Sequence, residues 1–480
     1  MIRVAQVGTF DVDNLGDLLF PVVFDRLLAE SAAELGSPIE CTCFSPRGSP
    51  AGQLYRDQRA SLPIEQLDRI DSDSPFDLVF IGGGDIIRDD DASLASIYPP
   101  QGSRPAFSQL SSPLKAADRR LVLLMPGVPL PLSRHFRTFL TNSFRRVCCA
   151  SVRDRLSATR LAEVVPADVR LAVLPDIVSA IARFYPRTQL LALGDSLVAP
   201  ELRRTGYICF QANPQFCADV NTTGQALLQL ERKTGLPVLL IELGKALGDG
   251  QVVTQLAKRF SFAIARPPAA SDPGTLMQRV AAIALSRGFL GTSLHGAILA
   301  HAYSVPHFCF SAAGLSKVGG FYETCSTGQC YSSHVDCFRH LDAISEWIGR
   351  PEARMGREAD AAVRSSDHAR VKNFVRKAIA SATDGGRTLP CGFALQADLQ
   401  YHKLQTRWQR RFGMRIENLH VPALAWRYPR MHLAMRRAVK LLWWSVTFQL
   451  LGKYRARRER LSAPLTRAAD SAMSSESSSI

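Results

Sequence analysis

Short runs of apolar residues alternate with longer amphipathic segments along the first part of the chain. The segment 18–35, for example, repeats apolar residues with the 3.6-residue period of a helix. Apolar runs bounded by glycine, proline or polar residues are typical of buried strands. We expect such strands at 3–7, 77–81, 121–125, 147–152 and 171–174. Each run ends in Gly, Arg or Asp, which predicts a parallel sheet whose carboxyl edge carries the functional groups.

A second series of the same kind follows the loosely patterned stretch 185–204. Strands are expected at 207–210, 237–241, 262–264, 288–290 and 307–310, with helices at 224–234, 250–260 and 274–286. Two successive βαβ layers whose loops face each other predict a cleft between two domains. We place these α/β domains at 1–195 and 196–345, followed by a helical extension at 346–385 that packs on the core.

Composition narrows the class of protein. The 480 residues are 46% apolar and 21% charged, and no apolar run has the roughly 18–20 residues needed to span a membrane. The N-terminus lacks the pattern of a signal peptide. The eleven cysteines include no C-x-x-C pair, so we expect free thiols in a cytoplasmic protein, without a metal site.

The net charge of +15 is concentrated near the C-terminus. Residues 402–467 hold 16 Lys and Arg against two Glu, so the rest of the chain is close to neutral, which argues against a nucleic-acid enzyme. Within the tail at 386–467, basic clusters flank the Trp-rich apolar run 441–451. This pattern suits the surface of an anionic membrane, although a helix packed on the body with a solvated basic face is an alternative. Residues 468–480 are small and polar and should be disordered.

The segment 288–306 has the most informative local chemistry. A short strand ends at Gly291, and Thr292 and Ser293 can cap the helix that follows. A strand that turns into a helix in this way offers backbone N–H groups to an anion, with His295 in the first turn and Gly296 beside it. For His295 two explanations stay open: an ordinary satisfied histidine or a catalytic one.

Three earlier loops also carry polar residues at the carboxyl ends of expected strands. The loop after the first strand contains Asn14, Gly16 and Asp17. The loop after the second contains a triple glycine (82–84) with Asp85, Arg88 and Asp89, and the fourth strand ends at Arg153. Plain turns are the alternative for the first two loops. No G-x-G-x-x-G occurs, so a dinucleotide cofactor is not expected.

These motifs resemble the polysaccharide pyruvyl transferase family. The resemblance covers residues 1–345 and rests on their order: Asn14-x-Gly-Asp17, Gly82-Gly-Gly-x-x-x-x-Asp89, Ser151-Val-Arg-Asp154 with Ser157, Pro175-Asp176, and Gly291-Thr-Ser-Leu-His-Gly296 with Val305-Pro306. It implies two Rossmann-like domains in a GT-B-like arrangement. The implied reaction transfers the enolpyruvyl unit of phosphoenolpyruvate to a sugar as a ketal and releases phosphate, without a cofactor.

The chemistry of phosphoenolpyruvate assigns hypothetical roles to these residues. His295 would protonate the pyruvyl donor or its leaving phosphate, and Asp89, or Asp85 as second choice, would be the general base. The expected substrate-binding residues are Asn14, Gly16, Asp17, Gly83, Gly84, Arg88, Arg153, Thr292, Ser293, Leu294, Gly296 and Lys317. Ser293 stands where many members of the family carry arginine.

The resemblance also suggests the acceptor and the cellular location. We expect a glycan or lipid-linked oligosaccharide as acceptor, and a cytoplasmic enzyme at the inner face of the membrane. Two alternatives remain: a GT-B-like glycosyltransferase that uses a nucleotide sugar, with Glu242 and Asp249 as candidate contacts, and a non-catalytic glycan-binding relative.

Overall fold

We analysed a computed structural model of the chain. It describes residues 1–88, 120–194, 197–214, 217, 219–265, 272, 274–310, 316–324, 331–332, 340–349 and 357–383. The basic tail and the expected base Asp89 therefore lie outside the described residues. Residues 1–394 form one compact unit, which holds all the elements discussed below.

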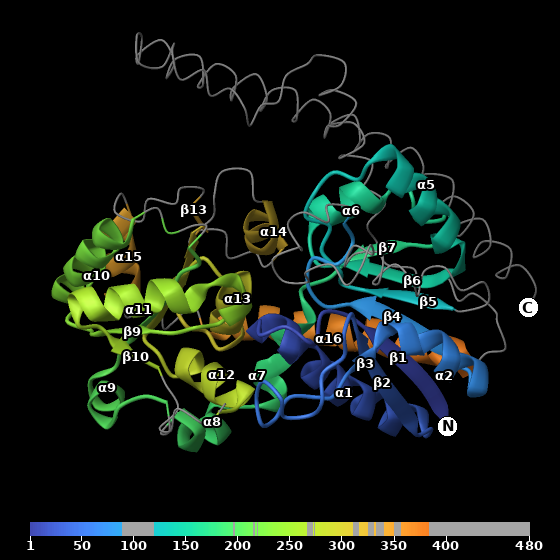
Figure 1. The fold of residues 1–480 in the computed structure, drawn as a ribbon, viewed down its shortest axis with the longest axis horizontal. Coiled ribbons are helices and arrows are strands. Elements are labelled where there is room, and N and C mark those ends of the chain that lie inside the picture. The colour runs from blue at the N-terminus through green and yellow to red at the C-terminus, as the bar shows by residue number, and fades with distance from the viewer. Residues whose placement is uncertain are drawn as a thin grey trace, which may run out of the picture. The chain divides into compact units, whose positions relative to one another are not determined.

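The first part of this unit is built on a parallel sheet, which has seven strands among the described residues (Figure 1). The strand order is β3-β2-β1-β4-β5-β6-β7, and every neighbouring pair is parallel. Its strands are β1 (Ile2–Val7), β2 (Ile39–Ser45), β3 (Leu62–Pro63), β4 (Leu78–Gly82), β5 (Leu121–Leu124), β6 (Val147–Val152) and β7 (Leu171–Val173). The central strands β4 and β5 are buried along their whole length, as expected where helices cover both faces of a sheet.

Helices connect and cover these strands. They are α1 (Leu15–Leu35), α2 (Leu67–Asp73), α5 (Arg134–Ser143), α6 (Arg155–Leu161) and α7 (Ile181–Phe184), with the 3-10 turns η1 (Ile64–Gln66), η3 (Phe144–Arg146) and η4 (Ile177–Ala180). The next two helices are α8 (Arg187–Gly194), which packs against α12 (Leu276–Ala284) of the second part, and α9 (Pro200–Thr205). The N-cap of α6 is Asp154, whose carboxylate accepts a hydrogen bond from the Ser157 amide.

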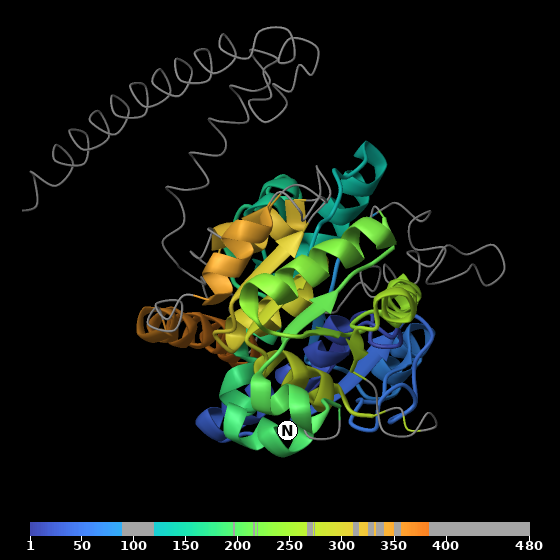
Figure 2. The same cartoon turned by 90° about the vertical axis from the view of Figure 1, so that its left-hand side faces the viewer.

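The second part repeats the architecture with a parallel sheet of six described strands. The strand order is β10-β9-β8-β11-β12-β13. The strands are β8 (Ile208–Gln211), β9 (Val238–Leu240), β10 (Ala263–Ile264), β11 (Gly288–Gly291), β12 (His307–Phe310) and β13 (Tyr331–Ser332). Figure 2 shows helices on both faces of this sheet. They are α10 (Val220–Thr234), α11 (Asp249–Phe260), α12 (Leu276–Ala284), α13 (Leu294–Ala302), α14 (Ser316–Thr324) and α15 (Leu341–Gly349), with η5 (Lys245–Leu247).

The helix α16 (Arg357–Thr383) returns to the first sheet and packs against α1 and η4 (Figure 1). Its anchors include the Arg120 guanidinium, which donates to the Ser381 carbonyl at 2.6 Å, and Arg370, which donates to the Val173 carbonyl at 2.9 Å. The helix α16, which begins at Arg357, therefore packs on the first part of the unit.

Hydrogen bonds join the two sheet regions beside α1 and α12. The Leu15 amide donates to the Leu243 carbonyl at 2.7 Å. The Asp57 carboxylate accepts from the amides of Leu276 and Met277 at 2.6 and 3.1 Å, so a side chain of the first region caps a helix of the second. These bonds hold the carboxyl edges of the two sheets close to one another.

Candidate functional site

A cavity of about 190 Å³ lies between the two sheets, and both regions contribute to its walls. The structure places twelve of the residues singled out from the sequence on its lining: Asn14, Asp17, Gly84, Asp85, Arg88, Arg153, Asp249, Thr292, Ser293, Leu294, His295 and Lys317. Gly16 packs against one of these residues instead, and Gly83 and Gly296 do not line the cavity. The sequence analysis did not identify Thr9, Val12, Ile86, Gln211, Asn213, Gly244 and Leu247, which line it as well.

The side of the cavity formed by residues of the first sheet region, here called the first wall, contains an ion-pair network. Arg153 forms the centre of this network. It follows β6, and its side chain is 4% exposed. The guanidinium pairs with Asp85, and it lies 3.9 Å from Asp154 (Nε–Oδ2) and 3.7 Å from Asp176 (Nη1–Oδ2). Burial works against its charge, but the carboxylates outweigh burial and raise the pKa of Arg153. This buried cation is therefore held charged at all physiological pH values.

Asp85 links this network to a second cation. Its other oxygen, Oδ2, lies 3.4 Å from Lys317 Nζ on α14. Burial favours the neutral acid, but Arg153 and Lys317 outweigh burial and lower the pKa of Asp85. A carboxylate with a lowered pKa is a weak proton acceptor, so Asp85 is better suited to holding cations than to general-base chemistry.

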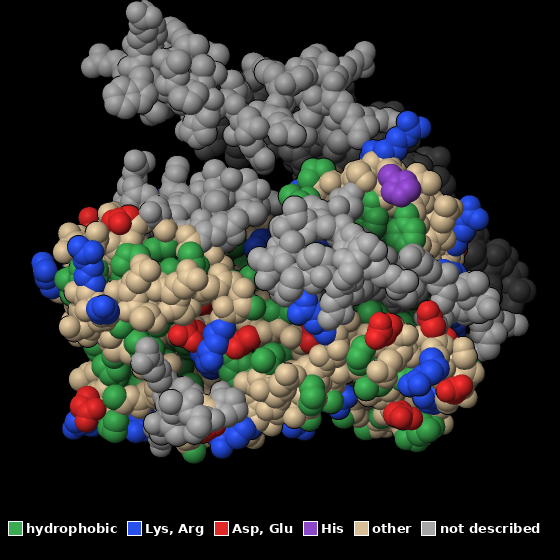
Figure 3. All heavy atoms as spheres, viewed as in Figure 1, with side chains coloured by type: hydrophobic (Ala, Val, Ile, Leu, Met, Phe, Trp, Pro, Cys, Tyr) green, Lys and Arg blue, Asp and Glu red, His purple; other side chains and the backbone are tan. Residues whose placement is uncertain are grey.

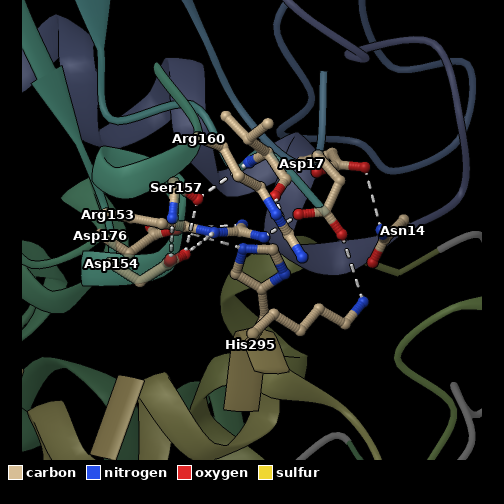
Figure 4. Close-up of polar contacts among 11 residues, drawn as sticks. Asn14, Asp17, Arg153, Asp154, Ser157, Arg160, Asp176 and His295 are labelled. Atoms are coloured by element: carbon tan, nitrogen blue, oxygen red, sulfur yellow. Dashed lines mark hydrogen bonds and ion pairs between the residues drawn. The ribbon is translucent and has the colours of Figure 1, made fainter. Parts of the chain in front are cut away.

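His295 extends from α13 towards this network (Figure 4). Its Nε2 lies 3.7 Å from Asp176 Oδ2, which is too far for a direct hydrogen bond, and neither atom has a hydrogen-bond partner within the described chain. Burial opposes the charge of Asp176, but His295 and Arg153 outweigh burial and lower its pKa. The Asp176 carboxylate therefore faces a cation of the first region and a histidine of the second.

Gly16 allows this approach. A Cβ atom at this position would lie 1.9 Å from Cγ and Nδ1 of the His295 ring. A side chain at position 16 would therefore push the imidazole away from Asp176.

Asp17 provides a second type of carboxylate on the same wall. Its Oδ2 accepts a hydrogen bond from Asn14 Nδ2 at 2.9 Å (Figure 4). Burial raises the pKa of Asp17, and the nearby His295 only partly offsets this effect. Gly84 lies against this carboxylate with a φ of +82°, and a Cβ atom at this position would lie 2.6 Å from Asp17 Oδ1.

The opposite side of the cavity, here called the second wall, is formed by residues of the second sheet region. It contains the start of α13, where the sequence predicted an anion site. Ser293 is the N-cap and accepts from the Gly296 amide at 3.1 Å. The amides of Thr292 and Ser293 already donate to Gln211 Oε1 at 3.0 and 2.8 Å. The protein thus supplies its own acceptor for three of these amides, which leaves those of Leu294 and His295 as the stronger candidates for an anion.

Charges of both signs are balanced around this site. Three cations (Arg88, Arg153, Lys317) and three carboxylates (Asp17, Asp85, Asp249) line the cavity. On the face drawn in Figure 3, Lys and Arg are interspersed with Asp and Glu, without a large patch of one sign among the coloured atoms. In the part of the chain that the structure describes, no group of His, Cys, Asp and Glu is arranged to hold a metal ion. No described helix is long and apolar enough to cross a membrane.

The fold is of the GT-B type, with two Rossmann-like domains and a polar cavity between them. The fold class expected from the sequence is therefore confirmed. The UDP-GlcNAc 2-epimerase from Neisseria meningitidis, solved with UDP-GlcNAc, superposes with a TM-score of 0.50 at 11% identity, covering 80% of this chain and all of that one. The same enzyme from Rickettsia bellii gives 0.47 at 12% identity (80% and 96% covered), and a trehalose 6-phosphate synthase from Burkholderia multivorans gives 0.43 at 10% (80% and 97%). Such distant similarity describes the fold alone.

The sequence profile of the polysaccharide pyruvyl transferase family matches residues 14–313. The chain therefore belongs to this family and is a transferase. A comparison with curated protein sequences found no significant match.

Proposed function

We propose that the protein transfers the enolpyruvyl unit of phosphoenolpyruvate to a sugar of a surface-polysaccharide precursor, forms a ketal and releases phosphate. The observation that carries this proposal is that His295 and Arg153, which both line the cavity between the two sheets, converge on the buried Asp176, in a chain of the pyruvyl transferase family. The family supports the transferase class, and the charges of the cavity support the anionic pyruvyl donor.

The phosphate and carboxylate of phosphoenolpyruvate need cations and amide N–H groups. Arg153, Lys317 and Arg88 line the cavity and supply the cations. The amides of Leu294 and His295 at the start of α13 supply the positive end of a helix dipole. Ser293 carries no charge, and its hydroxyl already caps the helix, so it does not replace the cationic contact that the arginine of many family members would supply. The cations of the first wall and of α14 would hold the pyruvyl donor instead.

Ketal formation requires proton transfer in both directions. In the proposed reaction His295 gives a proton to the methylene carbon of phosphoenolpyruvate while a sugar hydroxyl attacks C2 and loses its proton to a carboxylate base. Phosphate then leaves, and a second hydroxyl takes its place at C2 to close the ketal. Atoms balance: one diol and one phosphoenolpyruvate give one ketal and one phosphate.

Three carboxylates of the first region are candidates for the base: Asp17, Asp85 and Asp89. Asp89 lies outside the described residues, and the lowered pKa of Asp85 makes it a weak base. Asp17 lines the cavity with a raised pKa, which makes it a better proton acceptor than Asp85. We therefore propose Asp17 beside Asp89 as the base.

The acceptor would be a glycan or a lipid-linked oligosaccharide. We propose that the basic segment 402–467 brings the enzyme to the inner face of an anionic membrane, where such precursors are held. Binding of the full chain to vesicles that contain an anionic lipid, and its loss at high salt, would support this part of the proposal.

The test of the reaction is phosphate release from phosphoenolpyruvate by the purified protein, with crude lipid-linked glycan as acceptor. We expect acceptor-dependent release that His295→Gln reduces at least a hundredfold. The matched control is His301→Gln, because His301 is buried on the same helix but does not line the cavity. A UDP-sugar in a parallel reaction tests the glycosyltransferase alternative: turnover of the UDP-sugar without phosphate release would reject the pyruvyl donor. No turnover of either donor in the presence of a competent acceptor would favour a non-catalytic glycan-binding protein.

A further inference from the structure

The second wall of the cavity contains a buried carboxylate that the chemistry of the pyruvyl donor does not use. Asp249 is the first residue of α11, lines the cavity and is 1% exposed. Its Oδ2 accepts three hydrogen bonds, from Gln211 Nε2 at 2.9 Å and from the amides of Leu243 and Gly244 at 3.0 and 2.9 Å. Its Oδ1 has no partner among the described residues.

The two oxygens of this carboxylate are therefore in unequal environments. The bonds to Oδ2 fix the loop between β9 and α11, and a neutral asparagine oxygen could accept them as well. Burial raises the pKa of Asp249 to about 6, despite the three hydrogen bonds, so a carboxylate at this position destabilises the fold at neutral pH. A buried oxygen without a partner is costly, and such atoms in native proteins call for an explanation such as a missing ligand.

The surroundings of Asp249 indicate what kind of ligand could supply the missing hydrogen bond. Asp249 makes no ion pair within the described chain, whereas Arg153 and Lys317 gather around Asp85 on the other wall. A carboxylate without a cation repels the phosphate and carboxylate of an anionic pyruvyl donor. It suits a neutral group that donates a hydrogen bond, such as a sugar hydroxyl.

Neighbouring lining residues fit the same ligand. Asn213 adds a side-chain amide, and Leu247, 40% exposed, adds an apolar surface for the carbon face of a sugar ring. We propose that Asp249 binds the acceptor sugar, with Oδ1 accepting a hydrogen bond from a ring hydroxyl. This inference rests on the proposed function for the identity of the sugar as an acceptor, but the binding itself can be measured without turnover.

The experiment is saturation-transfer NMR with the full chain at pH 7.5 and the methyl pyranosides of glucose, galactose and mannose as probes. The test variant is Asp249→Asn, which keeps an oxygen for the loop amides and places an NH₂ group where Oδ1 was. The matched control is Asp219→Asn: Asp219 caps α10 through the Thr222 amide, is exposed and does not line the cavity. We expect at least one glycoside to bind the wild type and the control equally, and to bind Asp249→Asn about tenfold more weakly or worse.

Three results would overturn the inference. They are the absence of binding of any of the three glycosides to the wild type, unchanged binding to Asp249→Asn, and equal weakening in both variants. Ribose hydroxyls offer the same chemistry, so UDP is the fourth probe, and binding of UDP alone that Asp249→Asn removes would show a nucleotide site instead. Phosphate release from phosphoenolpyruvate is measured separately, so failure of the pyruvyl transfer is distinguishable from failure of the sugar site.

Discussion

Replacing Asp176 by asparagine tests whether this carboxylate supports the proton transfer by His295. Asp176 is 3% exposed, and its Oδ2 lies 3.7 Å from both His295 Nε2 and Arg153 Nη1. Its Oδ1 accepts from the Val178 amide at 3.0 Å, a cap that an asparagine oxygen can also provide. The substitution therefore removes a charge while keeping the local backbone geometry.

The size of the effect follows from the distance. Two unit charges 3.7 Å apart interact by about 4 kcal/mol at the effective dielectric constant of about 20 that suits buried sites. Only part of this energy is lost, because the neutral asparagine also escapes the cost of burying a charge. We expect a net loss of about 1.5 to 3 kcal/mol of stabilisation at the step in which His295 transfers its proton, which corresponds to a roughly tenfold to hundredfold lower kcat.

The assay is kcat for phosphate release at a fixed pH of 7.5. Asp176→Asn should lower kcat roughly tenfold to hundredfold. The matched control is Asp154→Asn, because Asp154 also caps a helix and lies near Arg153, at 3.9 Å. An unchanged kcat in Asp176→Asn, or the same loss in both variants, would refute a specific effect on His295.

Three further predictions concern geometry and stability. Gly16→Ala should lower kcat more than tenfold, because the new Cβ would lie 1.9 Å from the His295 ring, although alanine favours the helix by about 1 kcal/mol. The control is Gly349→Ala, where a Cβ meets nothing within 4 Å. Equal activity of the two variants would contradict the prediction. Asp57→Ala removes the cap that joins the two regions and should lower the free energy of unfolding by about 1 kcal/mol in urea denaturation, and an unchanged midpoint would contradict this role. Burial raises the pKa of Asp249 to about 6 in the folded state. The free energy of unfolding is therefore highest at low pH, and ionisation of Asp249 lowers it by up to about 3 kcal/mol as pH rises from about 4 to 6. Asp249→Asn should lack this decline when unfolding is measured at pH 4.5 and 7, and an equal decline in both proteins would refute it.

The buried strands could be predicted well from the sequence. β6 spans Val147–Val152 as expected, because a central parallel strand with both faces covered is a continuous apolar run. The sequence analysis did not identify β2 (Ile39–Ser45), where polar Glu40 and Thr42 interrupt the pattern and the first half is only partly buried. α6 begins at Arg155, because the Asp154 cap fixes its first turn.

Parallel topology explains why residues far apart in the sequence meet in the cavity. All strands of one sheet point the same way, so the loops after β1, β4 and β6 meet at one edge, and Asp17, Asp85 and Arg153 come together there. Pairwise contacts could not be predicted in this way. The sequence does not show that Arg153 would be surrounded by carboxylates, because each ion pair depends on side-chain directions set by packing.

Gln211 shows most clearly where a local motif is insufficient. The strand-to-helix turn at Thr292 and Ser293 predicts free amides, and this prediction is correct for the backbone path but not for the hydrogen bonds. Gln211 is the last residue of another strand, β8, and Asp249 accepts a hydrogen bond from its Nε2, so that Oε1 faces the two amides. The same wall therefore neutralises part of its own anion site and leaves a carboxylate oxygen without a partner. Around Asp249 such a wall disfavours an anion and favours a hydroxyl, in agreement with the proposal that the acceptor sugar binds there and the pyruvyl donor binds near Arg153 and Lys317.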